Sequence, residues 1–224
     1  MVSAATMVAA APKSTAQTGW VDGKPVFDSD RRRGNSPDRQ SEYEARRLQS
    51  HVVYPEFMDG GARPPIAASA PPIVSLPRAE PAGTIIIDTS GRRLYYTLSG
   101  GQAYEYPISV GREGFSWTGT ETISRVADWP DWHPPAEMRE REPGLPKIMY
   151  GGLRNPLGAK SLYLGNTLYR IHGTNDPKSI GLAASSGCFR MMNEHVTHLA
   201  SVAGVGTQVR VVARYASPRS ASRY

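Results

Sequence analysis

The sequence predicts a mainly β domain with one late helix, preceded by a flexible, proline-rich segment. The 22 Gly and 19 Pro among 224 residues favour strands and loops over long helices. From Gly83 onward, β-branched runs alternate with turn signals at the spacing of antiparallel strands. Tyrosine supplies 11 of the 19 aromatic residues, which fits a half-buried sheet surface.

Residues 1–82 are expected to form an unstructured linker. Polar and charged residues dominate it, and its end is crowded with Pro64, Pro65, Pro71, Pro72, Pro77 and Pro81. Such a composition cannot bury enough apolar surface to offset chain entropy. Within it, Glu42 to Leu48 could form a helical turn or two, and Val2 to Ala11 resembles the remnant of a signal peptide. The domain is expected at 83–215, followed by a flexible tail at 216–224.

The strands of the domain are indicated by β-branched and alternating runs between turns. Ser90-Gly91 and Gly100-Gly101 read as turns, and a long proline-rich excursion covers 129–146. The predicted strands are 84–89, 92–98, 103–110, 120–126, 150–153, 161–164, 167–172 and 207–212. The first three of these form a hairpin meander.

One helix is predicted late in the chain, after the single cysteine. Asn193 is placed as its N-cap, with Glu194 in the first turn and Gly204 at the C-terminal end. The apolar residues that recur at helical spacing are Val196, Leu199, Ala200 and Ala203.

Charge and hydropathy exclude several classes of function. The net charge of +6 is spread thinly along the chain. The densest basic run, Arg31 to Arg33, lies beside Asp28 and Asp30, which is typical of a mixed-charge loop rather than a nucleic-acid arm. No stretch reaches the roughly eighteen apolar residues of a membrane span. The mild positive balance would suit an anionic wall polymer as a partner.

Cys188 is the only cysteine of the chain, so no internal disulfide is possible. Exported proteins seldom keep an idle thiol, because in an oxidising compartment the thiol is damaged by oxidation or links two chains into a dimer. The side chain is therefore expected to be either buried and inert or functional.

The neighbours of Cys188 favour a functional thiol. The residue lies in a Ser/Gly-rich turn before the predicted helix, where backbone N–H groups and the helix dipole stabilise a thiolate. His172 ends a predicted strand, and within hydrogen-bond reach it would activate the thiol for acyl transfer. The N–H groups around Gly187 and Cys188 are candidates for an oxyanion hole, and Arg190 suits a substrate carboxylate. By spacing alone, however, such a Cys/His pair is more often coincidental than catalytic.

Two short motifs contain this pair, namely His172-Gly173-Thr174 and Ser185-Ser186-Gly187-Cys188-Phe189-Arg190. They resemble the signature of the L,D-transpeptidase catalytic domain family (YkuD, ErfK-like). The resemblance covers 83–213. It extends through Val110-Gly111-Arg112, Thr118-Gly119-Thr120, Trp132-His133-Pro134-Pro135, Gly151-Gly152 and Asn155-Pro156-Leu157-Gly158. One departure is Ser186, where some members carry a second histidine, which puts the subclass in doubt rather than the chemistry.

The resemblance implies a β-sandwich of mixed strands, with Cys188 as nucleophile and His172 as general base in a cleft. The Gly173 carbonyl is expected to orient the imidazole in place of a carboxylate or amide. The backbone at Gly187 is expected in the oxyanion hole. The remaining residues expected at the substrate site are Arg190, Ser185, Ser186, Thr174 and Trp117.

The implied reaction is acyl transfer on peptidoglycan stem peptides without a cofactor or metal. The thiol attacks the carbonyl of the diaminopimelate L-centre, D-alanine leaves, and an amine resolves the thioester. The acceptor could be a second stem or an outer-membrane protein, or water in an L,D-carboxypeptidase. A monomer in the periplasm or exported to the cell wall is expected. A non-catalytic peptidoglycan-binding module with an idle thiol stays open as the alternative.

Other candidate residues have plainer interpretations. His195 and His198 share one helical face, but no thiolate or acidic cluster completes a tetrahedral metal site, so surface or capping roles are expected. His133 is expected to be structural or to line the cleft. Ser185 and Ser186 have no separate base and better serve as hydrogen-bonding supports of the turn. The tryptophans that either form groove walls or simply pack are Trp117, Trp129 and Trp132.

Overall fold

A computed structural model describes residues 17–21, 24–27, 37–49 and 53–215. The helices are α2 (Pro37–Gln49), α3 (Ala136–Arg141) and α4 (Asn193–Val202), with short 3-10 turns at Ser99–Gly101 and Pro177–Ser179. The strands are β1 (Gln17–Val21), β2 (Lys24–Phe27), β3 (Phe57–Met58), β4 (Ile73–Ser75), β5 (Ile85–Asp88), β6 (Arg93–Thr97), β7 (Gln102–Pro107), β8 (Val110–Gly111), β9 (Gly119–Asp128), β10 (Ile148–Met149), β11 (Lys160–Leu164), β12 (Arg170–His172), β13 (Ala183–Ser185), β14 (Phe189–Arg190) and β15 (Gln208–Val212). The signal-like segment, the Arg31 to Arg33 run and the tail at 216–224 lie outside the described residues.

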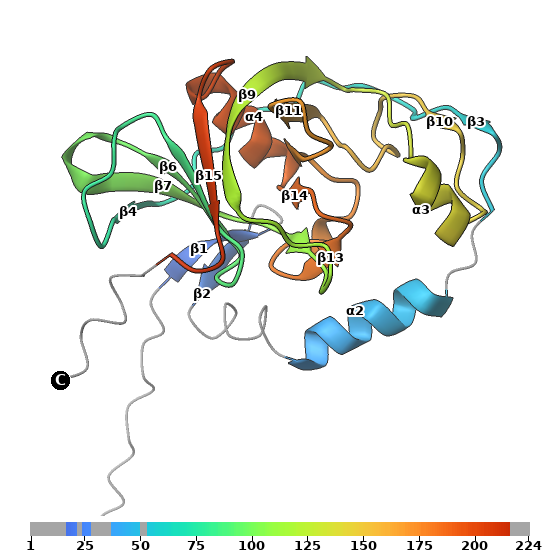
Figure 1. The fold of residues 1–224 in the computed structure, drawn as a ribbon, viewed down its shortest axis with the longest axis horizontal. Coiled ribbons are helices and arrows are strands. Elements are labelled where there is room, and N and C mark those ends of the chain that lie inside the picture. Colours follow the sequence, from blue (N-terminus) through green and yellow to red (C-terminus); the bar gives the residue numbers. More distant parts are fainter. Residues whose placement is uncertain (1–16, 22–23, 28–36, 50–52, 216–224) are drawn as a thin grey trace, which may run out of the picture.

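Nine strands form one mixed sheet in the order β14-β12-β11-β9-β15-β5-β6-β7-β4. The long, curved β9 joins its two halves: residues 119–122 pair with β15, and residues from Ile123 on pair with β11 (Figure 1). The main core contains side chains of both halves together with Val196 and Leu199 of α4. The predicted fold class, mainly β with mixed strands and a helix after the cysteine turn, is confirmed.

The central strand β5 shows why the sheet forms here. Ile85 and Ile87 are fully buried in the main core, while Ile86 packs with Tyr95 and Tyr215 in a second cluster on the other face. A strand covered on both faces reads as a continuous apolar run rather than an alternating one. Burial of each isoleucine stabilises the fold by roughly 1.5–3 kcal/mol.

Three predicted strands differ from the observed ones. The strand expected at 150–153 is a turn, and the actual strand β10 precedes it and pairs with β3. In that turn a Cβ on Gly151 would lie 1.8 Å from the Trp129 carbonyl oxygen. Glycine is therefore needed there so that the two backbone segments can approach closely. The run 167–172 is extended only from Arg170 on, and 103–110 is divided into β7 and β8 after Pro107, which cannot donate to a ladder.

The helices also differ from prediction. Asn193 is the first residue of α4 rather than its N-cap, and Met192 holds that position without a side-chain cap. Ala203 is the C-cap, so Gly204 directly follows the helix, where it was predicted. The proline-rich excursion contains α3. The helical turn expected at Glu42 to Leu48 is the thirteen-residue helix α2.

The prediction of an unstructured linker up to residue 82 is wrong for its described parts. β4 is an edge strand paired with β7, β3 pairs with β10, and β1 and β2 form a hairpin. The prolines do not prevent this, because their carbonyls still accept hydrogen bonds, as Pro72 does from Glu105 N–H at 3.0 Å.

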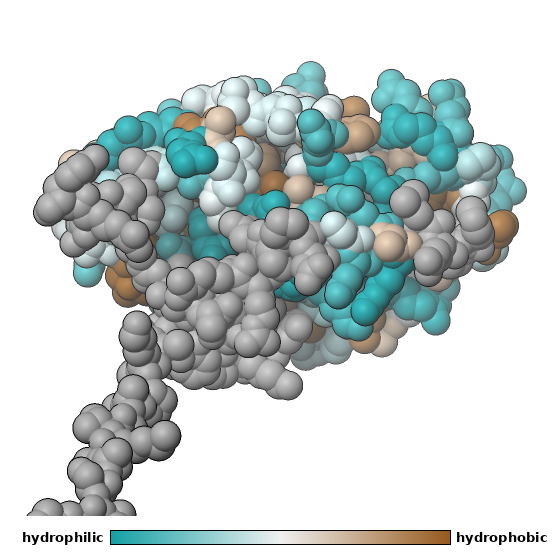
Figure 2. Space-filling view, turned by 90° about the horizontal axis from the view of Figure 1, so that it is seen from below, coloured by the Kyte–Doolittle hydropathy of each residue, from teal (hydrophilic) through white to brown (hydrophobic). Residues whose placement is uncertain are grey.

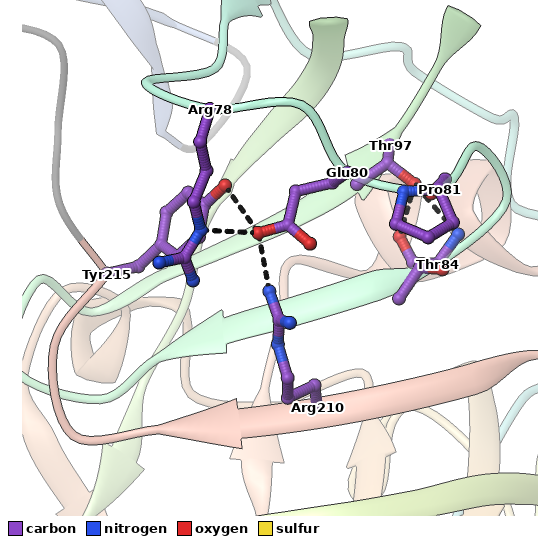
Figure 3. A network of polar contacts seen from close by, with 7 residues as sticks. All are labelled: Arg78, Glu80, Pro81, Thr84, Thr97, Arg210 and Tyr215. Carbon is purple, nitrogen blue, oxygen red and sulfur yellow. Dashed lines mark hydrogen bonds and ion pairs between the residues drawn. The ribbon is translucent and has the colours of Figure 1, made fainter.

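Glu80 anchors the end of this segment to the domain (Figure 3). Its carboxylate Oε1 accepts hydrogen bonds from Arg78 Nε at 2.8 Å, Arg210 Nη2 at 2.6 Å and the Tyr215 hydroxyl at 3.0 Å. The side chain is only 5% exposed. Burial alone would raise the pKa of Glu80, but these three donors outweigh it and hold the pKa below its usual value. The carboxylate is therefore a buried charge that three donors stabilise.

We expect Glu80→Gln to lower the free energy of unfolding by about 1–3 kcal/mol at neutral pH, because the three donors lose a charged acceptor. Since the folded pKa is depressed, this contribution is full above the unfolded carboxyl value of about 4.3 and disappears as pH falls through the folded value. Urea unfolding at pH 7 and at pH 3 measures both effects. The difference between wild type and variant should shrink at pH 3, whereas Glu140→Gln, on the exposed side of α3, should change little at either pH.

Candidate active site

The candidate site lies where β12 and β14 run parallel at one end of the sheet. Ile171 pairs with Phe189, and His172 pairs with Arg190. Ile171 and Phe189 point into the main core. Because successive side chains of a strand alternate between faces, Arg170, His172 and Arg190 share the opposite face. The cysteine directly before β14 joins them there.

These side chains line one cavity of about 440 Å³. One wall comes from the excursion at 129–146 and includes Trp132, Pro135, Met138, Arg141 and Glu142. The opposite side carries Leu168, Tyr169, Arg170, His172, Ala184, Ser185, Ser186, Cys188 and Arg190. The topology thus brings together the predicted nucleophile and the predicted base.

His172 is buried at the end of β12, with 4% of its surface exposed. Its Nδ1 lies 2.6 Å from the Gly173 carbonyl oxygen, which can only accept, so Nδ1 carries the proton and Nε2 keeps a lone pair. Burial lowers the pKa of His172 to about 3, and the Arg190 cation adds to the shift. The ring is therefore neutral at physiological pH and able to accept a proton.

Cys188 is partly exposed at the cavity. Its thiol donates weakly to the Leu168 carbonyl at 3.7 Å, and the Arg170 backbone N–H donates to the sulfur. No hydrogen bond between the sulfur and the His172 ring is present among the described residues. Burial raises the pKa of the Cys188 thiol, and the Arg170 and Arg190 groups offset only part of that rise. The resting pair is thus a neutral thiol and a neutral imidazole.

The turn before Cys188 is held by Ser185. Its hydroxyl donates to the Cys188 carbonyl at 2.5 Å and accepts the Gly187 N–H at 3.2 Å. Gly187 has φ +115°, and a Cβ there would lie 2.9 Å from the Tyr169 ring, so the turn requires glycine. Because the Gly187 N–H already has an acceptor, it is not free for an oxyanion in the resting structure.

Asn193 positions the other half of the pair. Its Oδ1 accepts the N–H groups of Ala159 at 3.0 Å and Thr174 at 3.1 Å, and its Nδ2 donates to the Thr174 carbonyl at 3.0 Å. These bonds fix the backbone that follows Gly173, whose carbonyl holds the imidazole. The sequence indicated only a helix cap at this residue.

The predicted substrate residues divide into two groups. Arg190 and Ser186 line the cavity with Ser185, and the Ser186 hydroxyl accepts a hydrogen bond from Arg112 Nη2 at 3.2 Å. Thr174 and Trp117 are not among the residues that line this cavity, and a substrate contact for either stays a prediction. The Thr174 hydroxyl instead accepts the Asp176 N–H at 3.0 Å. Trp117 stacks on Tyr169 at 4.7 Å between ring centres and packs against the core.

The other histidines that the structure describes lie outside the cavity. His195 is on the buried face of α4 and is 2% exposed, which corrects the expectation of a surface residue, and burial lowers its pKa to about 4. His198 Nδ1 lies 2.8 Å from the Tyr106 hydroxyl. His133 is exposed, whereas Trp132 lines the cavity. In the part of the chain that the structure describes, no three His, Cys, Asp or Glu side chains form a metal-binding group.

Comparison with known proteins shows to which family a chain with this site belongs. The sequence model of the YkuD family, described as the L,D-transpeptidase catalytic domain, matches residues 82–211, which is more than half of the chain. The chain belongs to the L,D-transpeptidase catalytic domain family.

Named relatives agree with this assignment over the same region. The chain is 37% identical over 138 residues to the probable L,D-transpeptidase YbiS of Escherichia coli, which covers 57% of this chain and 44% of YbiS. It is 34% identical over 139 residues to the probable L,D-transpeptidase ErfK/SrfK of Salmonella typhimurium, covering 58% and 44% of the two chains. The L,D-transpeptidase domain therefore spans less than half the length of these relatives.

One solved structure carries a different description. A Brucella melitensis chain described as a probable carnitine operon oxidoreductase is 41% identical, with 63% of this chain and 92% of that chain covered and a TM-score of 0.43. The family assignment rests on the match of the family model.

Sequence reasoning missed four of the arginines that line the cavity, namely Arg47, Arg112, Arg141 and Arg170. Arg170 lines the cavity beside Cys188, and the period of two along β12 already places it on the face of His172. Arg112, which holds Ser186, comes from a distant loop, and no local pattern indicated that contact. The site is consequently more cationic than the sequence suggested.

Proposed function

We propose that this L,D-transpeptidase domain transfers acyl groups between peptidoglycan stem peptides, with Cys188 as nucleophile and His172 as general base. The observation that carries the proposal is that the sole thiol of the chain and a buried, neutral imidazole line one cavity, together with Arg170 and Arg190. Attack on the diaminopimelate L-centre carbonyl of a tetrapeptide stem releases D-alanine and leaves a thioester on the sulfur. An amine acceptor then resolves the thioester.

The resting geometry defines the first step. The thiol must rotate away from the Leu168 carbonyl so that its proton can pass to Nε2 of His172 as the sulfur attacks. The Gly173 carbonyl stabilises the resulting imidazolium through Nδ1–H, and the Arg170 N–H supports the developing negative charge on sulfur. Arg190 is the proposed partner of a substrate carboxylate. The Gly187 N–H can donate a hydrogen bond to an oxyanion only after its bond to the Ser185 hydroxyl is broken.

The setting of the reaction is part of the same proposal. We place the protein in the periplasm or at the cell wall, as a monomer whose acceptor is a second stem, an outer-membrane protein amine or water. In the described residues, no helix has the length and apolar character needed to cross a bilayer. The net charge of +6 is compatible with an anionic wall polymer.

A second candidate is a peptidoglycan-binding module whose thiol is idle. Burial raises the pKa of the Cys188 thiol, and its hydrogen bond is directed to Leu168 rather than to the imidazole. An inert cysteine would show both features. The buried His172, however, has no evident purpose in a pure binder.

Product analysis separates these functions. The purified chain is incubated with a disaccharide tetrapeptide, with and without a second stem as acceptor, and the products are weighed by mass spectrometry. We expect loss of D-alanine together with a crosslinked dimer. A tripeptide product alone would assign an L,D-carboxypeptidase, and an unchanged tetrapeptide held in a complex would assign the binding module.

A further inference from the structure

Helix α2 lies beside the candidate site, and its Arg47 is one of the residues that line the cavity. In Figure 1 it runs below β13 and toward α3. At its start, Arg39 Nη2 donates to the Lys178 carbonyl at 3.0 Å. Near its end, Arg47 pairs with Glu142 at the C-cap of α3 on the opposite wall. The helix therefore contacts the segment that precedes β13 at one end and the C-cap of α3 at the other.

Gln40 makes the most informative contact. Its amide Nε2 donates to the Ala183 carbonyl at 2.9 Å, and its Oε1 accepts the Ala183 N–H at 3.1 Å. One primary amide thus satisfies both backbone groups of a residue at the open edge of β13. An adjoining strand would offer the same donor and acceptor.

The edge that Gln40 occupies leads to the thiol. β13 pairs with β8 on its other side, through Val110 N–H to the Leu182 carbonyl at 3.1 Å. Beyond Ala183 the chain continues through Ala184, Ser185 and Ser186, which line the cavity, to Cys188. An extended peptide added at this edge would run toward the reactive sulfur.

Tyr43 is a second contact of α2 with the domain, near the proposed carboxylate-binding residue Arg190. Its hydroxyl donates to Asp176 Oδ2 at 2.9 Å, and the Arg190 cation is near enough to act on it electrostatically. Burial raises the pKa of Tyr43, with Arg190 acting in the opposite direction. The bond from Tyr43 to Asp176 therefore holds α2 close to the cation proposed to bind a substrate carboxylate.

We propose that the open edge of β13 at Ala183 binds the backbone of an extended peptide, and that α2 occupies this edge as a strap that must leave before substrate enters. The peptide class rests on the proposed function, in which the donor is a stem peptide. The strap is held chiefly by polar contacts. Its remaining surface is exposed at Glu42, Glu44 and Arg46 and is largely hydrophilic (Figure 2). Such a helix can detach without uncovering a large apolar face.

The test removes the anchors of the strap in the full chain. Gln40→Ala with Tyr43→Phe deletes three hydrogen bonds from α2 to the domain, and the bond from Gln40 to Glu44 within the helix, while it keeps the helix propensity. We expect a maleimide carried on a long polyethylene glycol chain to modify Cys188 about tenfold faster in this variant. In a Cys188→Ala background, the disaccharide tetrapeptide should bind about tenfold more tightly when the strap is released. Arg47→Gln, at the other end, should act in the same direction.

Glu42→Gln is the matched control, because it changes the same helix at an exposed side chain. Equal maleimide rates in wild type and the double variant would overturn the proposal, as would a tetrapeptide affinity that is measurable but unchanged. If the maleimide rate rises but no form of the protein binds the tetrapeptide, the result refutes the proposed stem-peptide function and still supports the role of α2 as a strap. Circular dichroism with equal unfolding midpoints excludes general loosening of the fold.

Discussion

Cys188→Ala should abolish release of D-alanine from a disaccharide tetrapeptide and leave the fold intact. The chain contains a single sulfhydryl, so no other residue can carry the thioester. Loss of a nucleophile typically lowers turnover on the order of 10⁴-fold or more. The side chain is partly exposed, so the unfolding free energy should change by no more than about 1 kcal/mol. Product mass spectrometry and thermal unfolding measure the two quantities.

A covalent adduct provides the complementary readout of the same variant. A carbapenem should add its mass to the wild-type chain and not to Cys188→Ala. Cys188→Ser serves as the control for side-chain size, because it retains a hydroxyl in the same turn but is a far weaker nucleophile. Crosslinking that persists in Cys188→Ala would refute the proposed chemistry.

His172→Gln should lower kcat/KM about 10²–10⁴-fold, because the thiol loses the base that takes its proton. The pH dependence should change with it. Burial lowers the pKa of His172 to about 3, so the base is fully deprotonated above about pH 4 and the wild-type profile should be flat on its acidic side from pH 5 to 7. In the variant only the thiolate reacts, so the rate should rise about tenfold per pH unit up to the raised pKa of Cys188.

Rates of Cys188 alkylation by iodoacetamide across this pH range report the same behaviour without substrate. His133→Gln is the matched control, since that imidazole is exposed and lies outside the cavity. Identical pH profiles for wild type and His172→Gln would show that the imidazole takes no part in thiol activation.

Local patterns predicted much of the fold and little of the cavity walls. The isoleucines of β5 and the helical spacing of apolar residues in α4 indicate burial from the local sequence alone. Both elements were therefore placed correctly. The Cys188 and His172 motifs could be found because each stands at the end of a strand or in a glycine turn. Whether they meet depends on the parallel pairing of β12 with β14, which is a long-range contact.

Other features of the site were missed for a physical reason. The substrate contacts expected at Thr174 and Trp117 stay predictions, and the structure shows the Thr174 hydroxyl bonded within its turn and Trp117 packed against the core. α2 is charged and has little intrinsic apolar character, so its position depends on hydrogen bonds to residues more than a hundred positions away, such as that from Arg39 to Lys178. No window of local sequence contains such a partner.

The bonds of Asn193 make the orientation of the imidazole a joint property of three distant segments: the loop before β11, the turn after β12 and the start of α4. Grafting the His-Gly-Thr and Ser-Ser-Gly-Cys sequences onto an unrelated sheet would therefore transfer the reactive groups without their alignment. A recipient scaffold would also need a helix whose first residue spans both neighbouring loops.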